Sequence, residues 1–367
     1  MVTKLEAAKE FVKERGGIVP FDEVVEHLKK VGKWKYIKDD LKYAARHGED
    51  LVLIVRGGRE YLALNDMIRT SSENSQEIEI IEPDYSVFVP KEVPPYVPTN
   101  GELDILEAHF EAGIPVLFVG PKGVGKTLGI AYYAFKKNLP LIQFDCSETT
   151  KRQDLLGRFV LLDGEVKFVL GVLPQAIQAA NKFGAAVLVL EELNALTPQM
   201  QKTLNQLLDW RGHVFVPETN KIYRLKPGAK LLIAATMNPS SYGGVYALNE
   251  DLKSRFGQLF VEYPSEKKEK EIVKVVVGDN VPESLVEGII KLAKETRNGW
   301  ENGELSYALS PRDVVQFLQI IQVYLEKFDS AKALRYALTT AVLGKYEDKN
   351  ERKTVKMRIQ SIFGVMS

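Results

Sequence analysis

The feature that most constrains the fold is a glycine-rich segment, residues 120–127, with the sequence GPKGVGKT. It fits the pattern G-x-x-x-x-G-K-[ST] and lies between an apolar, strand-like run at 115–119 and a helix-like run that begins at Lys126. In such a setting the backbone N–H groups converge on phosphate oxygens, the lysine reaches the outer phosphates, and the hydroxyl of Thr127 can ligate Mg²⁺. The segment therefore predicts a phosphate-binding loop. The expected nucleotide contacts are Gly120, Pro121, Lys122, Gly123, Val124, Gly125, Lys126, Thr127 and Leu128.

Composition excludes several classes of protein. The 367 residues suffice for roughly two or three domains with real cores. Lys+Arg and Asp+Glu both number 49, which argues against a uniformly basic coat for nucleic acid. The single cysteine, Cys146, excludes an internal disulfide framework and fits a reducing compartment.

The longest apolar runs are far shorter than the roughly 20 residues that cross a bilayer. Residues 1–13 mix both charges and lack the apolar core of a signal peptide. We therefore expect a soluble, cytoplasmic protein without membrane contact. The four histidines show no metal-ligand spacing, so surface or packing roles are expected for them.

The first 66 residues predict a small α+β domain. Three stretches with helical apolar spacing precede two β-prone runs that flank Gly57-Gly58, and a short extended piece precedes the second helix. A Gly-Gly pair between two such runs is a strong hairpin signal. In this order the pattern resembles a winged-helix domain. The helical stretches are 5–12, 21–31 and 36–46, the extended piece is 18–19, and the β-prone runs are 51–55 and 60–64.

Basic side chains make DNA a candidate partner of this domain. In a winged helix they could contact phosphate in and beside a groove. Acidic neighbours such as Asp39 and Asp40 dilute the patch, so protein docking and a purely structural role are the alternatives. The candidate nucleic-acid contacts are Lys35, Lys38, Lys42, Arg46 and Arg59.

Three regions follow the first domain. Residues 67–100 contain five prolines and acidic residues, which is typical of an extended linker. Residues 101–264 alternate helix-like and buried strand-like segments, which predicts a parallel sheet covered on both faces. Residues 265–367 show helical patterns alone and predict a smaller helical domain. The expected strands are 115–119, 141–145, 186–190, 231–236 and 258–261, and the expected later helices are 266–277, 283–297, 311–327 and 331–343.

Two carboxylates follow one of the expected strands, at Glu191 and Glu192. Downstream of a phosphate loop they are a Walker B candidate, in which the first holds Mg²⁺, often through water, and the second orients or deprotonates the attacking water. The metal position is normally Asp. Because Mg²⁺ demands near-octahedral ligands at about 2.0–2.1 Å, the extra methylene of Glu191 puts the hydrolysis rate in question.

Three more polar residues are candidates for the same site. Asn238 follows the strand 231–236, and the carboxyl ends of strands face the ligand crevice in such a sheet. Arg255 could serve as an arginine finger for a phosphate on a neighbouring subunit, a role that contributes roughly 10³–10⁵ in rate. Arg312 lies in the first turn of a helix capped by Ser310 and could point towards the core. The alternative interpretations are that Asn238 only forms a turn and that the two arginines are solvated surface residues.

Taken in order, these motifs resemble those of an AAA+ ATPase. Two hairpins, one turning at Asp163-Gly164 and one at 213–225, lie where the MoxR and dynein-related branch carries insertions. The resemblance covers residues 101 to about 343. The matching segments are 120–127 for Walker A, 191–194 for Walker B, 235–239 for sensor 1, 254–256 for the arginine finger and 310–312 for sensor 2.

This resemblance implies an AAA+ α/β core, a following helical lid, and ATP with Mg²⁺ as the bound nucleotide and metal. It implies catalytic roles for Lys126, Glu192, Asn238, Arg255 and Arg312, and a homo-oligomeric ring, commonly a hexamer. The leading hypothesis is a ring-forming ATPase that remodels a macromolecular partner, with protein favoured over DNA. The alternatives are a nucleic-acid motor or loader recruited through residues 1–66, and a nucleotide-gated adaptor with slow hydrolysis.

Overall fold

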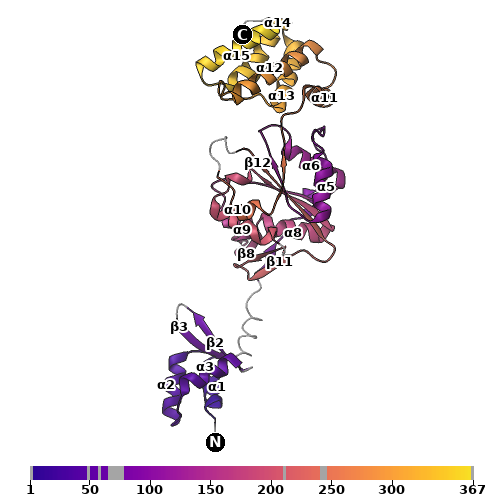
Figure 1. Ribbon diagram of the computed structural model, residues 1–367. Helices are drawn as coiled ribbons and strands as arrows, with labels where there is room; N and C mark the ends of the chain where they lie inside the picture. Colours follow the sequence, from indigo (N-terminus) through magenta and orange to yellow (C-terminus); the bar gives the residue numbers. More distant parts are fainter. Residues whose placement is uncertain are drawn as a thin grey trace. The chain divides into compact units, whose positions relative to one another are not determined.

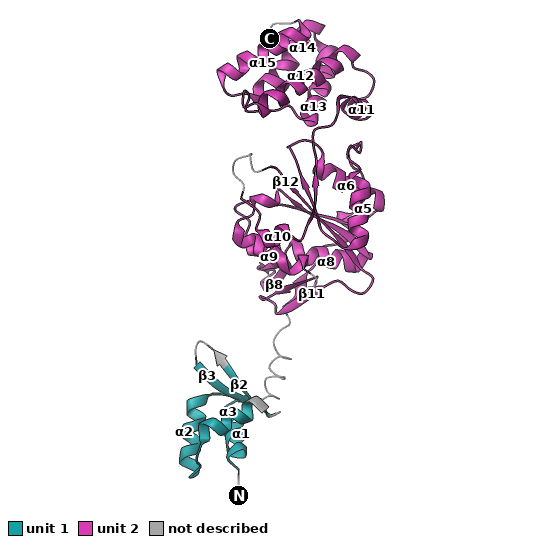
Figure 2. Cartoon of the chain, in the orientation of Figure 1, with its two compact units in different colours: residues 1–78 teal, residues 79–367 magenta. Residues whose placement is uncertain are grey.

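The computed structural model describes residues 3–47, 50–56, 59–64, 78–209, 212–239 and 246–364. The chain divides into two compact units, residues 1–78 and 79–367 (Figure 2). The predicted glycine turn at 57–58 lies outside the described residues.

In its described residues the first unit has three helices and a small sheet. Its sheet has the order β1-β3-β2 and is antiparallel throughout. The core is filled by the apolar stripes that the sequence showed, with Val12, Val24 and Leu28 fully buried. The order of elements is the expected one, while the winged-helix resemblance stays a prediction. The elements are α1 (Lys4–Glu14), β1 (Ile18–Pro20), α2 (Phe21–Val31), α3 (Ile37–His47), β2 (Leu51–Arg56) and β3 (Arg59–Leu64).

The segment expected to be a linker, 67–100, differs from that expectation in its second half, because residues 79–100 belong to the second unit. β4 (Ile80–Ile81) pairs with β8 (Glu165–Leu170), and the 3₁₀ turn Tyr85–Phe88 buries Tyr85 completely. These contacts come from single apolar residues spaced among prolines. Such runs are too short to give a periodic signal, so composition alone indicated a linker.

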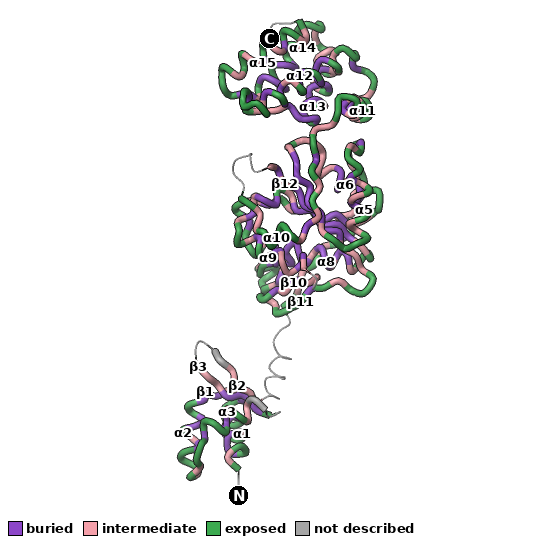
Figure 3. The backbone as a smooth tube through the Cα atoms, in the orientation of Figure 1, coloured by how far each residue is buried: buried purple, intermediate pink, exposed green. Residues whose placement is uncertain are grey.

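The second unit is built on a five-stranded parallel sheet with the order β13-β5-β12-β9-β6 (Figure 1). Its strands read as nearly continuous apolar runs, as expected when helices cover both faces. The buried strands form the purple centre of this unit in Figure 3. The predicted fold class is therefore confirmed. The strands are β5 (Val116–Val119), β6 (Leu141–Asp145), β9 (Ala185–Glu191), β12 (Lys230–Met237) and β13 (Gly257–Phe260).

Alternate residues of β5 face opposite sides of the sheet. Val116 and Phe118 join the cluster that holds residues of α5 (Glu102–Ala112) and α6 (Lys126–Lys137). Leu117 and Val119 join the cluster that holds residues of α8 (Val172–Phe183) and α9 (Pro198–Leu208). The period of two along a strand thus assigns one helix layer to each face.

Both expected insertion hairpins are present. β7 (Gly157–Leu162) pairs with β8 in antiparallel register, and β10 (His213–Val216) pairs with β11 (Lys221–Arg224). The first hairpin turns at Asp163 and Gly164, with φ of 53° and 80°. Positive φ at both central residues is what a tight two-residue hairpin requires. Three short helical pieces lie nearby: α7 (Arg152–Leu156), the 3₁₀ turn Leu193–Ala195 and α10 (Glu250–Lys253).

The helical region after β13 forms its own core around Leu292, Phe317 and Ile321. The sequence named four helices here and missed the last, which buries only Val355 and Ile359 in an otherwise charged segment. Among the described residues, every helix is too short or too polar to span a bilayer. The elements are α11 (Glu266–Val276), α12 (Glu283–Glu301), α13 (Pro311–Lys327), α14 (Ser330–Ala337), a π turn (Leu338–Val342), a 3₁₀ turn (Leu343–Lys345) and α15 (Lys349–Phe363).

Candidate functional site

The glycine-rich loop joins the end of β5 to the start of α6. Gly123 and Gly125 have φ of 75° and 93°, which L-residues with side chains rarely adopt. At Gly120 the constraint is space, since an added Cβ would lie 2.1 Å from the carbonyl oxygen of Val261. The loop therefore has the tight backbone that phosphate binding at a helix N-terminus needs.

Lys126 lies inside this loop. Its Nζ donates to the carbonyl oxygens of Gly120 and Pro121, both at 2.7 Å, and to Oδ1 of Asn238 at 3.2 Å. Asn238 follows β12, 112 residues further along the chain. The fold thus brings the first and third predicted motifs into direct contact.

Burial lowers the pKa of Lys126 to about 8. The positive charges of Arg312 and Lys122 contribute to this lowering of the pKa, while Glu192 opposes it. A buried cation without a paired carboxylate is costly, and an incoming phosphate would relieve that cost. The electrostatics at this position therefore favour an anionic ligand.

The two predicted metal ligands also converge. Thr127 Oγ1 donates to Oε2 of Glu191 at 2.8 Å, and Gln143 Nε2 donates to the other carboxylate oxygen at 3.4 Å. Hydroxyl and carboxylate oxygens are the ligands that Mg²⁺ takes from proteins, usually one or two of them beside phosphate and water. In the described part of the chain, no group of three or more His, Cys, Asp or Glu side chains could hold a metal ion. Thr127 and Glu191 therefore fit Mg²⁺.

Glu192 has an unusual backbone. Its φ of 51° and ψ of 47° are left-handed, which is uncommon for a residue with a side chain and tends to mark functional positions. Its side chain is 52% exposed; Oε1 accepts from Asn238 Nδ2 at 3.4 Å and lies 4.0 Å from Nζ of Lys122. Its backbone N–H donates to Thr236 Oγ1 at 3.3 Å. The carboxylate is thus turned towards the loop and remains open to water.

A residue to which the sequence assigned no role holds Asn238 in place. Asn194 is buried, and its Nδ2 donates to the carbonyl oxygen of Asn238 at 3.0 Å. The backbone carbonyl oxygen of Asn194 accepts from the backbone N–H of Tyr246 at 2.7 Å. In the sequence, Asn194 is only the polar last residue of the segment Glu191 to Asn194. No spacing rule predicts its contact with Asn238.

The helical region reaches the loop through the start of α13. Ser310 caps this helix and Pro311 occupies its first position. A Cβ at Gly123 would lie 2.3 Å from Ser310 Oγ and 3.3 Å from Cβ of Arg312. The start of α13 therefore lies against the loop, and Arg312 lies beside Gly123.

These residues surround a cavity of ≈ 390 Å³, within the size range of small-molecule sites. The sequence predicted its polar wall and missed its apolar wall. Short proline-rich and lid segments contribute the latter, and neither carries a recognisable motif. The polar wall is Lys122 to Leu128, Glu191, Glu192, Thr236, Asn238 and Arg312. The remaining lining is Pro94, Pro95, Tyr96, Val97, Thr99, Ile272, Val276, Pro311 and Val315.

Residues 115–256 match the family described as AAA domain (dynein-related subfamily). This part of the chain is an AAA domain. The protein NorQ of Paracoccus denitrificans is 28% identical over 224 residues, 61% of this chain and 79% of NorQ. The denitrification regulatory protein NirQ of Pseudomonas aeruginosa is 25% identical over 246 residues, 67% of this chain and 89% of NirQ. A crystal structure from Cytophaga hutchinsonii has a TM-score of 0.39 at 19% identity, over 74% of this chain and 82% of that one.

Arg255 lies at the end of the AAA match but outside the cavity. Its Nη2 donates to Asp251 Oδ1 at 3.0 Å, one turn earlier in the chain. Its Nε is buried and has no hydrogen-bond partner among the described residues. Of the predicted site residues, Lys122 to Leu128, Glu191, Glu192, Asn238 and Arg312 line the cavity, whereas Gly120, Pro121 and Arg255 do not.

The candidate nucleic-acid contacts in the first unit lie among carboxylates. Lys38 pairs with Asp22 at 3.3 Å, and Lys42 pairs with Glu60 at 2.7 Å. Lys35 and Arg59 are exposed, and the side chain of Arg46 lies outside the described residues. Unlike Lys126, whose hydrogen bonds go to neutral oxygens, these two lysines already have partners of opposite charge.

Proposed function

We propose that this chain is an ATPase that couples ATP hydrolysis to the remodelling of a macromolecular partner, in the manner of MoxR-like AAA+ proteins. The supporting observation is the meeting of Lys126, Thr127, Glu191, Glu192 and Asn238 at one cavity. They come from the ends of two strands, β9 and β12, and from the start of one helix, α6. Parallel strands place such ends at one edge, where α/β proteins bind their ligands.

The proposed reaction assigns a role to each polar group. Glu192 accepts a proton from water while the water oxygen bonds to the γ-phosphorus, and the bond from that phosphorus to the bridging oxygen breaks, leaving ADP and phosphate. Asn238 orients the water, and Lys126 and Arg312 stabilise charge on the phosphates. When bound, Mg²⁺ would neutralise phosphate charge, with Thr127 and Glu191 as its protein ligands.

We further propose that the active form is a homo-oligomeric ring, with the hexamer common among AAA+ proteins as the first expectation. Arg255 supports this, because it cannot serve the cavity of its own chain from its place beside Asp251. In a ring it would approach the phosphates bound by the neighbouring subunit, as arginine fingers do when supplied in trans.

The partner is proposed to be a protein rather than DNA. Lys38 and Lys42 are paired with carboxylates of their own unit. Contact with DNA phosphates would have to replace those pairs, which lowers the gain from each contact.

The test of the site compares Lys126→Ala with Lys137→Ala. Both lysines lie on α6, but Lys137 is at its far end and pairs with Glu107. We expect Lys126→Ala to abolish measurable ATP turnover and Lys137→Ala to leave it unchanged. Equal turnover in Lys126→Ala and the unmodified chain would refute the assignment. Tight ATP binding with turnover at background, even with a partner present, would favour the nucleotide-gated adaptor instead.

The partner itself can be captured with Glu192→Gln, which should bind ATP without splitting it. We expect a protein to co-purify with this variant in the presence of ATP and to be lost in the Lys126→Ala/Glu192→Gln double variant. Capture of duplex DNA in a salt-sensitive manner would favour the nucleic-acid motor.

A further inference from the structure

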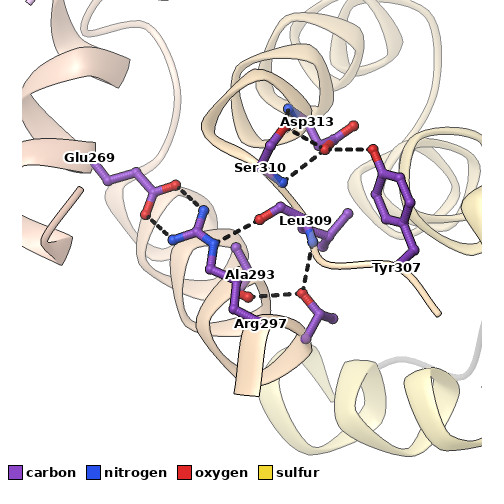
Figure 4. A network of polar contacts seen from close by, with 8 residues as sticks. Glu269, Ala293, Arg297, Tyr307, Leu309, Ser310 and Asp313 are labelled. Atoms are coloured by element: carbon purple, nitrogen blue, oxygen red, sulfur yellow. Dashed lines mark hydrogen bonds and ion pairs between the residues drawn. The ribbon is translucent and has the colours of Figure 1, made fainter. Parts of the chain in front are cut away.

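A buried ion pair lies inside the helical region, away from the nucleotide cavity. Arg297 on α12 is 7% exposed and Glu269 on α11 is 1% exposed. The guanidinium donates from Nη1 to Oε2 at 2.9 Å and from Nη2 to Oε1 at 2.6 Å (Figure 4). This bidentate geometry fixes the plane of the guanidinium as well as its position.

The same guanidinium holds the segment that leads into α13. Arg297 Nε donates to the carbonyl oxygen of Leu309 at 2.8 Å, and the neighbouring Thr296 Oγ1 accepts from the N–H of Leu309 at 3.1 Å. Thr296 in turn donates to the carbonyl of Ala293 at 2.8 Å. Two consecutive residues of α12 therefore hold both backbone polar groups of Leu309. Figure 4 shows the bond from Arg297 to Leu309.

Arg312 follows Leu309 by three residues, with little freedom between them. Ser310 N and Oγ both donate to Asp313 Oδ2, at 2.8 and 2.7 Å, and Tyr307 donates to the same oxygen at 3.0 Å. Pro311 has a fixed φ. The backbone is thus held on both sides of Arg312, by Leu309 before it and by Asp313 after it.

The guanidinium also contacts the connection between the sheet and the helices. Its Cζ lies 4.4 Å from the ring centroid of Tyr263, between β13 and α11. Arg297 therefore joins three segments: the connection at Tyr263, α11 through Glu269, and the approach to α13 through Leu309.

Stability alone does not explain this arrangement. Removing two charges from water costs about as much as their attraction returns, so an apolar pair of similar volume would stabilise a helical core equally well. Only a planar group with several donors can hold Glu269 and the Leu309 carbonyl together.

We propose that Arg297 is a positioning residue for Arg312, acting through Leu309 and with Glu269 as its anchor. The inference rests on the proposed function, since it concerns the approach of Arg312 to a nucleotide. It gives this hydrogen-bond network a role in nucleotide binding and turnover, although Arg297 and Glu269 do not line the cavity.

The test uses Arg297→Lys in the full chain, alone and combined with Arg312→Ala. Lysine keeps the charge but has one nitrogen, so it cannot hold both Glu269 oxygens and the Leu309 carbonyl. We expect Arg297→Lys to weaken binding of a fluorescent ATP analogue and to slow ATP turnover by roughly tenfold or more, since small misplacements of a positioning group have effects of up to about 100-fold. In the Arg312→Ala background the same change should have almost no further effect.

Arg358→Lys is the matched control. Arg358 on α15 also bonds a carbonyl, that of Glu295, and a carboxylate, that of Glu304, and both of these partners lie outside residues 309–313. We expect thermal unfolding to shift similarly in both lysine variants, with binding and turnover reduced only in Arg297→Lys. Glu269→Gln, which keeps the size of the side chain, serves as the second variant if Arg297→Lys fails to fold.

Multiplicative losses in the double variant, or an equal loss of binding in Arg358→Lys, would overturn the inference by showing a general weakening of the helices. Failure of the proposed function gives a different result. In that case the unmodified chain would bind the analogue no better than Lys126→Ala, and the role of Arg297 would fall with it.

Discussion

The sequence offered two groups of basic residues as sites for an anion, and the structure treats them differently. Lys126 is held by backbone carbonyls and an amide at the mouth of α6, with Arg312 lining the same cavity. Lys38 and Lys42 of the first unit each contact a carboxylate of their own unit. The sequence alone does not distinguish the two groups, because both consist of basic side chains.

The difference indicates that an anion is bound where positively charged side chains lack carboxylate partners. Exposed ion pairs are weak, typically below about 1 kcal/mol, and satisfy both partners cheaply. A buried lysine that meets only neutral oxygens keeps most of its charge uncompensated. Burial and partner type therefore separate the two groups where residue identity does not.

Arg255 is the strongest test of the distinction between cations paired with carboxylates and cations that bind a ligand, because its contact with Asp251 resembles the ion pairs of the first unit. If it acts in a neighbouring site, Arg255→Ala should bind ATP normally and lose roughly 10³-fold or more in turnover. Steady-state turnover and equilibrium binding of ATP measure the two quantities. Lys253→Ala, at an exposed position two residues earlier, is the control. Full turnover in Arg255→Ala would place Arg255 with the surface ion pairs.

Glu192 extends the comparison to the acidic residues of the cavity. Glu192→Gln keeps the hydrogen-bonding shape beside Asn238 but removes the proton acceptor, so we expect turnover to fall roughly 10²- to 10⁴-fold with ATP affinity retained. Glu218→Gln, in the exposed turn between β10 and β11, should leave both unchanged. A loss of affinity as large as the loss of turnover would show that Glu192 binds nucleotide rather than activating water.

The charge of Lys126 gives a pH prediction with opposite signs for stability and binding. Burial lowers its pKa to about 8 from 10.5, so above pH 8 the unfolded chain holds more protons than the folded one. Stability without nucleotide should therefore rise by about 1–2 kcal/mol relative to Lys126→Met between pH 8 and 10. ATP affinity should fall over the same range as Lys126 loses its charge. Denaturant unfolding and ATP titration of both proteins measure these changes; parallel pH curves for the two proteins would contradict the burial of a charged Lys126.

The smallest effect is expected in the first unit. Lys42→Ala removes the pair with Glu60 and the contact of Nζ with the Phe21 ring, at 5.3 Å from its centroid. We expect a loss of less than about 1 kcal/mol in unfolding free energy and no change in ATP turnover. Binding to duplex DNA at increasing salt checks the remaining alternative. A marked loss of DNA affinity in Lys42→Ala would return this unit to the list of nucleic-acid contacts.

The sequence predicted the sheet and the polar wall of the cavity because both depend on local patterns. Buried parallel strands are continuous apolar runs, and Lys126, Glu191 and Asn238 each follow or begin an element whose position the topology determines. The apolar wall, including Tyr96 and Val276, comes from segments without periodicity. The contacts of Asn194 and Arg297 depend on residues brought together only by packing, so no spacing in the sequence announced them.

Position 123 is one of the unrestricted positions in the phosphate-loop pattern, yet in this chain its occupant also determines how closely the start of α13 can approach the loop. A methyl group there would overlap Ser310 Oγ, so the start of α13 could not rest on the loop as it does now. A related chain with a larger residue at this position would have to hold its helical region further from its phosphates. The size of a single side chain can therefore limit how near the helical region lies to the phosphates.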